Sequence, residues 1–407
     1  MRKFTLMLLA LSLTAMTSMA GGYQVGLHSV RNVGMGLIGT SLTYDASSLF
    51  YNPGGVSFID SAWSFSGGMS FIMGRVTFQD QDVMYQTHLK HELNTPFYFY
   101  GSYKATKFMS VGLAINTPYG NRLSWNDDWK GRFIIQNITF KAITFQPTVS
   151  FKVKNVFGFG AGLVIAYGNV NLNKAIPIEG TGGEGTMNLK GNTVNVGFNA
   201  GIMIHPLTGF NIGVDYRSRI MMDVTGAKTV FTVPASVAAN FPENKADVSL
   251  PLPANLDFGA SYEIKGKVMI GFSLNYVFWN TYDSLVFDFQ QTTPAVGRTS
   301  TPTLYESKLI ERLGVQWKIN PVVTVRVGGY FDPSPVPDDY LNPQLPSTNE
   351  IGITAGLSVF PIKGLSIDAA FLYLMGMERS GTDTPDNFSG TYSTAFYIPG
   401  IGLTYNF

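Results

Sequence analysis

The feature that most constrains the fold of this chain is a two-residue alternation of apolar with polar or small side chains. The segment 268–278 places Val, Ile, Phe, Leu, Tyr and Phe at every second position. In 210–217 the apolar positions alternate with Asn, Gly, Asp and Arg, and in 157–163 they alternate with glycine. Because side chains of a β-strand point alternately to opposite faces, each segment has one apolar face. A soluble sandwich shows the same alternation, so the connections must decide the architecture.

The connections alternate strictly between short and long. The short ones fall at 104–107, 154–155, 205–208, 265–266, 320–321 and 361–364. The long polar ones fall at 79–95, 118–137, 171–192, 225–250, 290–302, 332–349 and 381–390. This rhythm is typical of the periplasmic turns and external loops of a bacterial barrel. The sequence therefore predicts an all-β, antiparallel transmembrane barrel of about 14 strands.

Composition favours a membrane barrel over soluble domains. Charged residues are 14% of the chain, well below the roughly 25% of soluble proteins, and aromatic residues are also 14%. After the first 20 residues, no segment approaches the roughly 20 apolar residues of a spanning helix. The net charge of +1 gives no electrostatic reason to expect nucleic acid. The chain contains no Cys, so disulfides and thiol chemistry are excluded.

The two ends predict export to the outer membrane of a Gram-negative bacterium. Residues 1–20 read as a signal peptide: Arg2 and Lys3 precede an apolar stretch that ends in Ser-Met-Ala. The last residues, 401–407, alternate apolar with small or polar side chains and end in Phe407. Such a last strand resembles the signal by which the barrel-assembly machinery recognises its clients.

Residues 21–58, called the hatch below, do not alternate cleanly. A segment of this length without a strand is too long for an ordinary loop, and its apolar residues argue against a disordered tail. A barrel of about 14 strands encloses a lumen that must be filled if it is not to leak. We therefore predict that the hatch folds inside the barrel, and that residues 59–407 form the barrel itself.

Several motifs, in order, resemble the FadL family of outer-membrane long-chain fatty-acid and hydrocarbon transporters. Asn52-Pro53-Gly54 is similar to the family's Asn-Pro-Ala hatch motif, with Gly54 in place of Ala. The other matching motifs are Asp45-Ala46-Ser47, Asn116-Thr117-Pro118-Tyr119-Gly120, Trp129-Lys130-Gly131-Arg132, Gly213 to Ser218, Leu252-Pro253-Ala254, Asp332 to Asp338 and Phe388 to Tyr392. One departure follows Leu345-Pro346, where the family often has Asp and this chain has Ser347.

The resemblance implies a mechanism. External loops capture an apolar ligand, a lumenal site binds it, the hatch moves, and the ligand leaves through a gap in the wall beside a kinked strand. The hatch and gating residues would be Asp45, Ala46, Ser47, Asn52, Pro53 and Gly54. Asp and Asn before Ser, Pro and Gly also cap local turns, and this turn chemistry is the immediate role that we expect for Asp45 and Asn52.

A fatty acid needs an apolar groove and a cation for its carboxylate. Trp129, Arg132, Phe133 and Ile134 combine both in an external loop, although Trp129 could instead belong to the interfacial aromatic girdle and Arg132 could face water. On the polar faces of their strands, and so predicted to point into the lumen, are Arg217, Arg312 and Arg326. Lumenal arginines commonly pair with acids instead, here Asp215 or Asp45.

Other functions are less well supported. A hydrolase needs a nucleophile beside a base. Of the four His, His205 lies in a predicted periplasmic turn and His28 in the hatch, and neither is beside an obvious Ser and acid arrangement. His88 and His91 flank Lys90, so we interpret that loop as solvated rather than as a metal site. A passive porin or adhesin remains an alternative, as does uptake of aromatic hydrocarbons by the same route. We expect a monomer without cofactor or metal, which binds a hydrophobic small molecule and the outer-membrane lipid.

Overall fold

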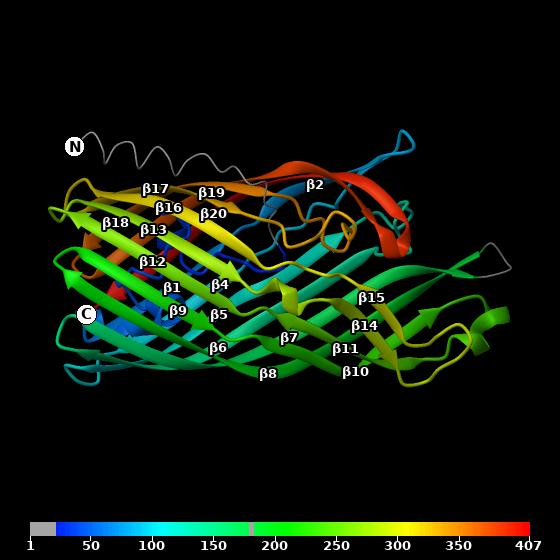
Figure 1. The fold of residues 1–407 in the computed structure, drawn as a ribbon, viewed down its shortest axis with the longest axis horizontal. Helices are drawn as coiled ribbons and strands as arrows, with labels where there is room; N and C mark the ends of the chain where they lie inside the picture. The colour runs from blue at the N-terminus through cyan, green and yellow to red at the C-terminus, as the bar shows by residue number, and fades with distance from the viewer. Residues whose placement is uncertain (1–21, 179–182) are drawn as a thin grey trace.

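The computed structural model describes residues 22–178 and 183–407, so the signal peptide predicted at 1–20 lies outside the described residues. The chain forms one closed antiparallel sheet around a long lumen (Figure 1). Its first and last strands close the barrel, since Ser64 lies opposite Asn406 and Ser70 opposite Gly400. Among the described residues, no helix is long and apolar enough to cross a membrane.

The sheet contains 20 hydrogen-bonded segments. They are β1 Trp63–Ser70, β2 Met73–Asp80, β3 Gln86–His88, β4 Phe97–Tyr103, β5 Met109–Ser124, β6 Asn137–Val153, β7 Phe157–Ile178, β8 Gly183–Leu207, β9 Phe210–Arg217, β10 Ile220–Thr232, β11 Asn244–Leu252, β12 Asn255–Ile264, β13 Val268–Val277, β14 Ser284–Phe289, β15 Thr299–Pro302, β16 Lys308–Lys318, β17 Val323–Asp332, β18 Glu350–Ile362, β19 Leu365–Asp383 and β20 Phe388–Asn406. Six spanning strands consist of two consecutive segments each and eight of one, which gives 14.

The wall is apolar outside and polar or small inside. On β8, Val194, Val196 and Phe198 are 61%, 64% and 49% exposed, whereas Asn199 and Gly201, on the other face, are buried. An exposed apolar band of this kind is what lipid requires. The apolar side chains of this band leave water by contacting membrane lipid rather than by packing in a protein core.

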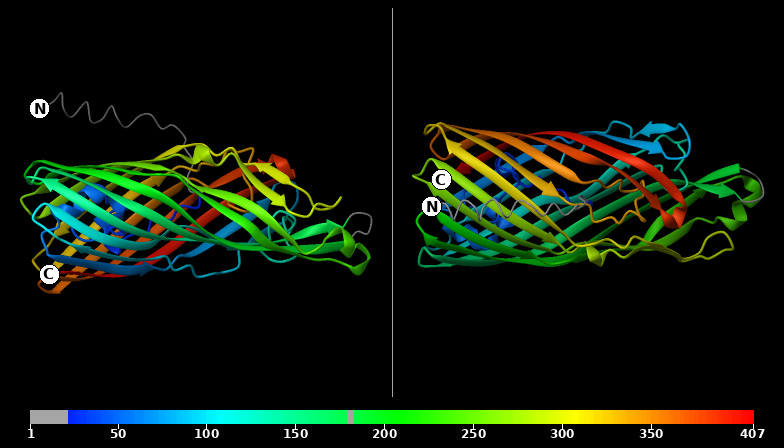
Figure 2. Two further views of the ribbon diagram at one scale, coloured as in Figure 1. Left: turned by 90° about the horizontal axis from the view of Figure 1, so that it is seen from below. Right: turned by 45° about the horizontal axis from the view of Figure 1, so that its top comes forward.

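Several strands extend beyond the expected loop boundaries. The sequence predicts a polar connection at 171–192, but β7 continues to Ile178 and β8 already begins at Gly183. Their outer parts remain paired, and their outward face is polar, with Asn188 donating to Asn171 over 2.9 Å. The barrel therefore projects well beyond the apolar band at the end that holds the long loops, as the green strands show (Figure 2).

The described part of the hatch fills the lumen near the end that holds the short turns (Figure 2). It contains the short helices α2 Val30–Val33 and α3 Ser48–Tyr51 and the 3-10 helix η2 Pro53–Phe58. Wall glycines let its backbone approach closely. A methyl group on Gly160 would lie 2.5 Å from the carbonyl oxygen of Pro53, and one on Gly356 would lie 2.8 Å from the Cα of Gly34. Two further 3-10 helices in the described chain lie in the external loops, η3 Ala235–Asn240 and η5 Thr384–Asp386, and a third, η4 Trp279–Thr281, interrupts the spanning strand between β13 and β14.

A break in the wall lies between β4 and β5. The two strands pair only as far as Asn116 of β5, whereas β5 continues along β6 to Ser124. The register of β5 against β6 shifts between Asn116 and Tyr119, because β5 has one extra residue there. Pro118 lies in this bulge and has no N–H to donate to a ladder. In the described chain, the outer part of β5 therefore has no ladder with β4.

The first residues of the hatch occupy the unpaired edge of β5. The backbone N–H of Val25 donates to the carbonyl of Pro118 over 2.8 Å, and the N–H of Gly120 donates to the carbonyl of Tyr23 over 3.0 Å. Gln24 forms an antiparallel bridge with Tyr119 between these two bonds. The hatch thus substitutes for the missing neighbour of β5 from inside the lumen.

Candidate ligand-binding site and hatch

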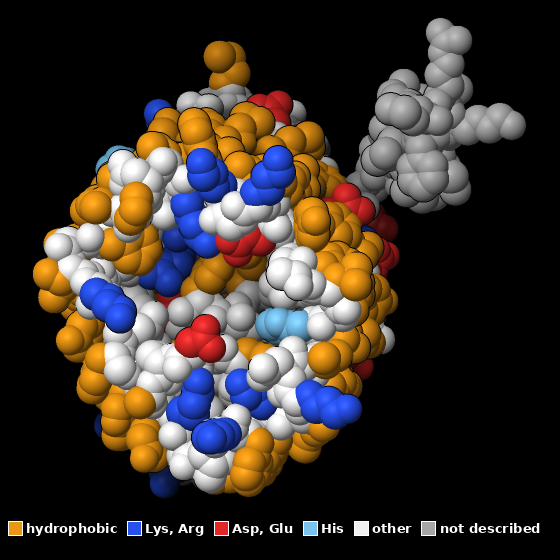
Figure 3. Space-filling view, turned by 90° about the vertical axis from the view of Figure 1, so that its left-hand side faces the viewer, with side chains coloured by type: hydrophobic (Ala, Val, Ile, Leu, Met, Phe, Trp, Pro, Cys, Tyr) orange, Lys and Arg blue, Asp and Glu red, His pale blue; other side chains and the backbone are white. Residues whose placement is uncertain are grey.

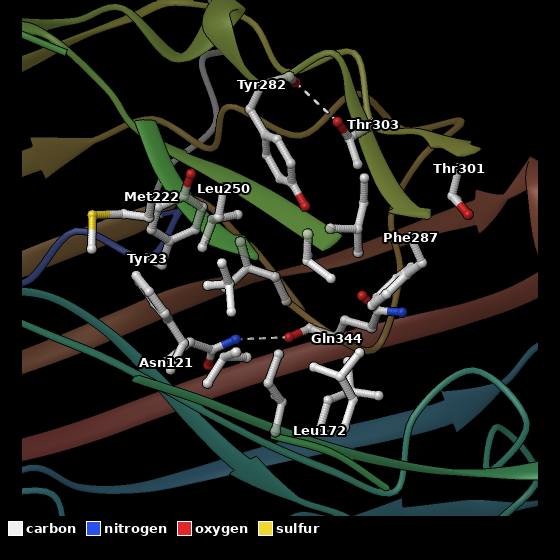
Figure 4. A pocket seen from close by; sticks show the side chains of 18 of the residues that line it. Tyr23, Asn121, Leu172, Met222, Leu250, Tyr282, Phe287, Thr301, Thr303 and Gln344 are labelled. Carbon is white, nitrogen blue, oxygen red and sulfur yellow. Dashed lines mark hydrogen bonds between the residues drawn. The ribbon is translucent and has the colours of Figure 1, made fainter. Parts of the chain in front are cut away.

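An apolar cavity of about 300 Å³, called the central cavity, lies inside the barrel on the outer side of the hatch. Its wall is mostly hydrophobic (Figure 4) and includes Ile134, Phe140, Leu172, Met222, Leu250 and Tyr282. At the cavity wall, the side-chain amide of Asn121 donates to the backbone carbonyl of Gln344 over 2.9 Å. A mostly apolar cavity with a few polar groups is the usual form of a small-molecule site.

A second cavity of about 480 Å³, called the outer cavity, lies between the projecting strands and the external loops. Phe231, Phe241 and Val296 are among its apolar side chains. Six residues line both cavities, namely Ile134, Leu172, Lys174, Phe287, Thr299 and Gln344. The two spaces therefore adjoin and form a continuous apolar path from the loops into the lumen.

Lys174 is the one cation that lines either cavity in the described chain. It lies on β7 on the same face as Leu172 and Ile176 and is partly buried. Within residues 22–178 and 183–407, no ion pair involves Lys174. One acid, Asp386, also lines the central cavity. An ammonium group between two apolar cavities is placed to meet an anionic headgroup whose tail lies in either one.

The start of the hatch separates the central cavity from smaller spaces beneath it. Tyr23 lines the central cavity, whereas the next residue, Gln24, lines two inner cavities of about 200 and 40 Å³. Tyr23 packs in a ring cluster, with Trp279 at 4.9 Å and Tyr282 at 6.1 Å between centroids. The strand-like segment that covers the edge of β5 is therefore also the floor of the ligand path.

Asn52 connects the hatch to the wall and caps a helix at the same time. Its side-chain oxygen accepts from the N–H of Gly54 over 3.0 Å, which caps η2, and Pro53 follows at the first position of that helix. Its amide nitrogen donates to the carbonyls of Thr40, at 2.8 Å, and Ile202, at 2.9 Å. The predicted turn role is thus present, together with a direct link to β8.

Asp45 performs two similar tasks. One carboxylate oxygen accepts from the N–H of Ser47 over 2.9 Å, and the other lies 2.9 Å from Arg31 of the hatch. Arg31 also lies 3.5 Å from Asp368 of β19, so the three charges form one buried network between hatch and wall. The neighbouring N–H of Ala46 donates to Ser64 of β1 over 2.9 Å.

The predicted external ligand loop is brought together only in part. Ile134 lines both cavities. Trp129 is buried, stacks on Trp125 at 4.4 Å and donates to the carbonyl of Ile135 over 2.7 Å, so it lies inside the loop cluster rather than in an aromatic girdle. Arg132 lies over the ring of Phe133 at 4.5 Å, and its Nε donates to both carboxylate oxygens of Glu184 at 3.0 and 3.1 Å.

The three predicted lumenal arginines lie inside the barrel, but none of them lines the central or outer cavity. Arg217 donates to Gln146 over 2.9 Å and to the carbonyl of Phe50 over 2.8 Å, which fixes the hatch to the wall. Arg326 donates to Gln316 over 2.8 Å and to Ser358 over 2.6 Å. Arg312 lies 3.9 Å from Asp257 and lines both inner cavities.

Comparison with known proteins identifies the family. Over residues 11–407 the chain matches the family described as "Outer membrane protein transport protein (OMPP1/FadL/TodX)". The chain belongs to the FadL family. An outer membrane protein of Neisseria meningitidis is 22% identical over 100% of this chain and 98% of its own length. A long-chain fatty acid transport protein of Salmonella typhi is 22% identical over 68% of this chain and 69% of its own length.

Solved structures agree with this assignment at the level of the fold. A FadL homologue of Pseudomonas aeruginosa has a TM-score of 0.85 at 18% identity, with 95% of this chain and 100% of that one covered. The toluene transporter TodX of Pseudomonas putida has a TM-score of 0.75 at 14% identity, with 96% and 99% covered. The prediction of a barrel of about 14 strands with an N-terminal segment inside it is confirmed.

Membership in the FadL family also establishes location and general activity. The barrel spans the outer membrane of a Gram-negative bacterium and transports hydrophobic compounds, and the family is not an enzyme family. Among the described residues, no group of three His, Asp or Glu is arranged to hold a metal ion. His88 instead lies 2.9 Å from both Arg75 and Thr77 through its ring nitrogens.

Sequence reasoning missed the most suggestive cation of this FadL-family site. Lys174 falls inside the stretch that we interpreted as a polar loop, because the intervening Asn171 and Asn173 suggested solvent on all sides. The signal was nevertheless present: Val170, Leu172, Lys174 and Ile176 alternate at every second position. That period places Lys174 on the apolar, inward face of an extended strand.

Proposed function

We propose that this FadL-family barrel transports long-chain fatty acids and that Lys174 binds their carboxylate. The observation that carries the proposal is the position of a single cation between two adjoining apolar cavities. An acyl chain gains about 0.8 kcal/mol per CH₂ when it leaves water, so a continuous apolar path supplies the driving force for capture. A carboxylate, by contrast, needs a charged donor once it is desolvated.

The proposed route begins in the outer cavity, where Phe231 and Phe241 from the projecting strands and loops receive the acyl chain. The chain then passes Ile134 and Leu172 into the central cavity, while the carboxylate reaches Lys174. Asp386 also lines the central cavity and interacts electrostatically with Lys174, so it opposes this arrangement and a bound carboxylate would have to compete with it for the ammonium group.

Release would follow through the wall between β4 and β5. The support for this step is the loss of pairing beyond Asn116 and the presence of Pro118 in a bulge. Because residues 23–25 cover this edge, the ligand would have to displace them from β5 before it could leave sideways into the membrane. The hatch residues Asp45 and Asn52 would hold the rest of the plug in place during this movement.

Uptake of labelled oleate tests the proposal in cells that lack their own transporter, with entry of a small polar dye as a measure of leakage. We expect Lys174→Gln to weaken saturable oleate uptake, because a hydrogen bond to a charged group contributes about 1.5–3 kcal/mol, or roughly tenfold to a hundredfold in affinity. Lys190→Gln is the matched control, since Lys190 lies on the outer face of neighbouring β8. Equal uptake by both variants would refute the role of Lys174.

Aromatic hydrocarbons are the second candidate, favoured by the rings at the base of the central cavity. Tyr282 lies 4.8 Å from Tyr305 and 6.1 Å from Tyr23 between ring centroids. A neutral ring needs no cation, so toluene uptake should be unaffected by Lys174→Gln. Saturable toluene uptake without saturable oleate uptake would select this candidate, and dye entry without either would indicate a porin-like barrel.

A further inference from the structure

The end of the barrel that holds the short turns carries an unusual concentration of lysine. We call this set the lysine rim, and it consists of Lys104, Lys107, Lys152, Lys154, Lys265, Lys267, Lys318 and Lys363. These residues lie in or next to five of the six short turns, and His205 lies beside the remaining one. Seen from this end, basic side chains are distributed around the mouth of the barrel (Figure 3). The net charge of the whole chain is only +1, so this is a local feature.

Few acids neutralise the lysine rim. Asp60 and Glu263 are acidic side chains at this end. Of the rim lysines, only Lys318 forms an ion pair with a described residue, Glu263, at 2.6 Å. Burial and the neighbouring Lys152 lower the pKa of Lys104, and Asp60 only partly opposes this. At the opposite end several basic side chains are paired with acids, as in Lys228–Glu243 at 2.7 Å and Lys90–Asp127 at 3.1 Å.

Aromatic side chains place the lysine rim at the membrane surface. Trp63, Tyr103, Tyr262 and Trp317 are exposed on the outer wall at this end, and Trp63 lies 4.4 Å from Tyr103 between ring centroids. Tyr and Trp in this position mark the boundary between hydrocarbon and headgroups. Tyr103 and Trp317 immediately precede rim lysines in the chain. Lys152 faces the hatch, over the ring of Phe58 at 5.5 Å, and Lys318 faces Glu263. The exposed rim lysines lie just beyond the hydrocarbon, at the level of the phosphates, and they are Lys107, Lys154, Lys265, Lys267 and Lys363.

We propose that the lysine rim binds the phosphodiester headgroups of anionic phospholipids in the periplasmic leaflet of the outer membrane. The charges are spread around the circumference on short turns, and this distribution matches surrounding lipid better than one compact protein partner. A lysine near an anionic membrane surface attracts it by enough to change binding about fivefold. The rim would thereby anchor the barrel axially and enrich anionic lipid around its periplasmic end.

Spin-labelled lipids test this inference on the full chain reconstituted into phosphatidylcholine vesicles. The ratio of the association constants of labelled phosphatidylglycerol and labelled phosphatidylcholine measures the preference directly. The test variant replaces five rim lysines that no described ion pair engages, as Lys107→Gln, Lys154→Gln, Lys265→Gln, Lys267→Gln and Lys363→Gln. The matched control replaces five lysines at the other end, as Lys90→Gln, Lys190→Gln, Lys228→Gln, Lys245→Gln and Lys308→Gln.

We expect the wild-type chain and the control to prefer phosphatidylglycerol severalfold, and the rim variant to approach a ratio of one. Equal association of both lipids with the wild-type chain would overturn the inference, as would an equal loss of preference in the control. Complete loss of the phosphatidylglycerol preference in excess inorganic phosphate, at matched ionic strength, would also overturn the inference. Heat-modifiable migration on gels establishes that each variant is folded. If the variant with five substitutions does not fold, the double variant Lys154→Gln/Lys265→Gln replaces it, and we expect a smaller loss of preference.

Discussion

A disulfide between Gln24 and Tyr119 would lock the start of the hatch to the edge of β5. Gln24 and Tyr119 are a non-hydrogen-bonded antiparallel pair, because the two backbone hydrogen bonds join the residues on either side of them. Antiparallel pairs of this kind have Cα atoms about 4.5 Å apart, within the roughly 4.4–6.8 Å that disulfides span. The chain contains no Cys, so Gln24→Cys/Tyr119→Cys has a single way to form a bridge.

The free energy of opening can be worked from the contacts of this segment. Two backbone hydrogen bonds and two side-chain ones, from Tyr23 to the carbonyl of Pro251 and from Gln24 to Asn255, contribute about 1 kcal/mol each. Exposing the buried ring of Tyr23 costs about 2 kcal/mol. The total of about 6 kcal/mol corresponds to roughly one open molecule in more than ten thousand without ligand. A ligand must therefore bind the open state more tightly to populate it, and a covalent bond prevents that state altogether.

Oleate uptake before and after reduction is the assay. We expect the oxidised double variant to lose at least tenfold in uptake and to recover when the disulfide is reduced. The single variants and the external pair Ser380→Cys/Thr391→Cys, whose hydroxyl oxygens lie 2.7 Å apart, are the controls. Wild-type uptake by a fully oxidised double variant would refute the reasoning, because release would then not require the hatch to leave β5.

Three further changes test the packing of the hatch and loops. Gly160→Leu should displace the hatch and raise dye entry, because the new side chain would meet the backbone of Pro53, with overpacking costs of about 1–3 kcal/mol. Arg31→Met should lower the free energy of unfolding by about 3–5 kcal/mol in denaturant titration, since it leaves buried Asp45 and its partner carboxylate unpaired, and adding Asp45→Asn should restore part of the loss. Trp129→Ala should cost about 3–5 kcal/mol of local stability, seen as faster proteolysis of the external loops, while the barrel stays folded.

The fold could be predicted because contact with lipid requires apolar side chains at every second position of a strand, and this two-residue period is visible in the sequence. The alternation in 268–278 corresponds to β13, and the short connection at 265–266 lies between β12 and β13 as expected. The outer ends of strands were harder to predict. Above the apolar band the outward face of β7 and β8 is polar, so this stretch resembles a polar loop in the sequence, while the hydrogen-bonded ladder continues and the inward face lines the cavities. Lys174 lies in this region, which is why the pattern did not single it out.

The arginines illustrate a different limit of sequence reasoning. The alternation along their strands predicts that the lumenal arginine side chains point into the barrel, as they do in the structure. It does not predict which groups those side chains contact. Arg217 donates to the hatch backbone at Phe50, and Arg132 donates to Glu184 on a strand 52 residues away. These partners depend on how the hatch and loops pack in three dimensions. Local spacing carries no information about such contacts, so the roles of these arginines in ligand binding remain predictions.

The wall break follows from one residue whose effect can be derived from its chemistry. Pro118 removes a donor from β5, and the bulge around it ends the ladder with β4. An exposed strand edge is a template for another strand, and here residues 23–25 of the same chain occupy it. A defect in the wall and the segment that covers it are thus complementary. The covering segment is held by two ladder bonds, two side-chain hydrogen bonds and one buried ring, all non-covalent, so the same feature that seals the barrel can open when a ligand favours the open state.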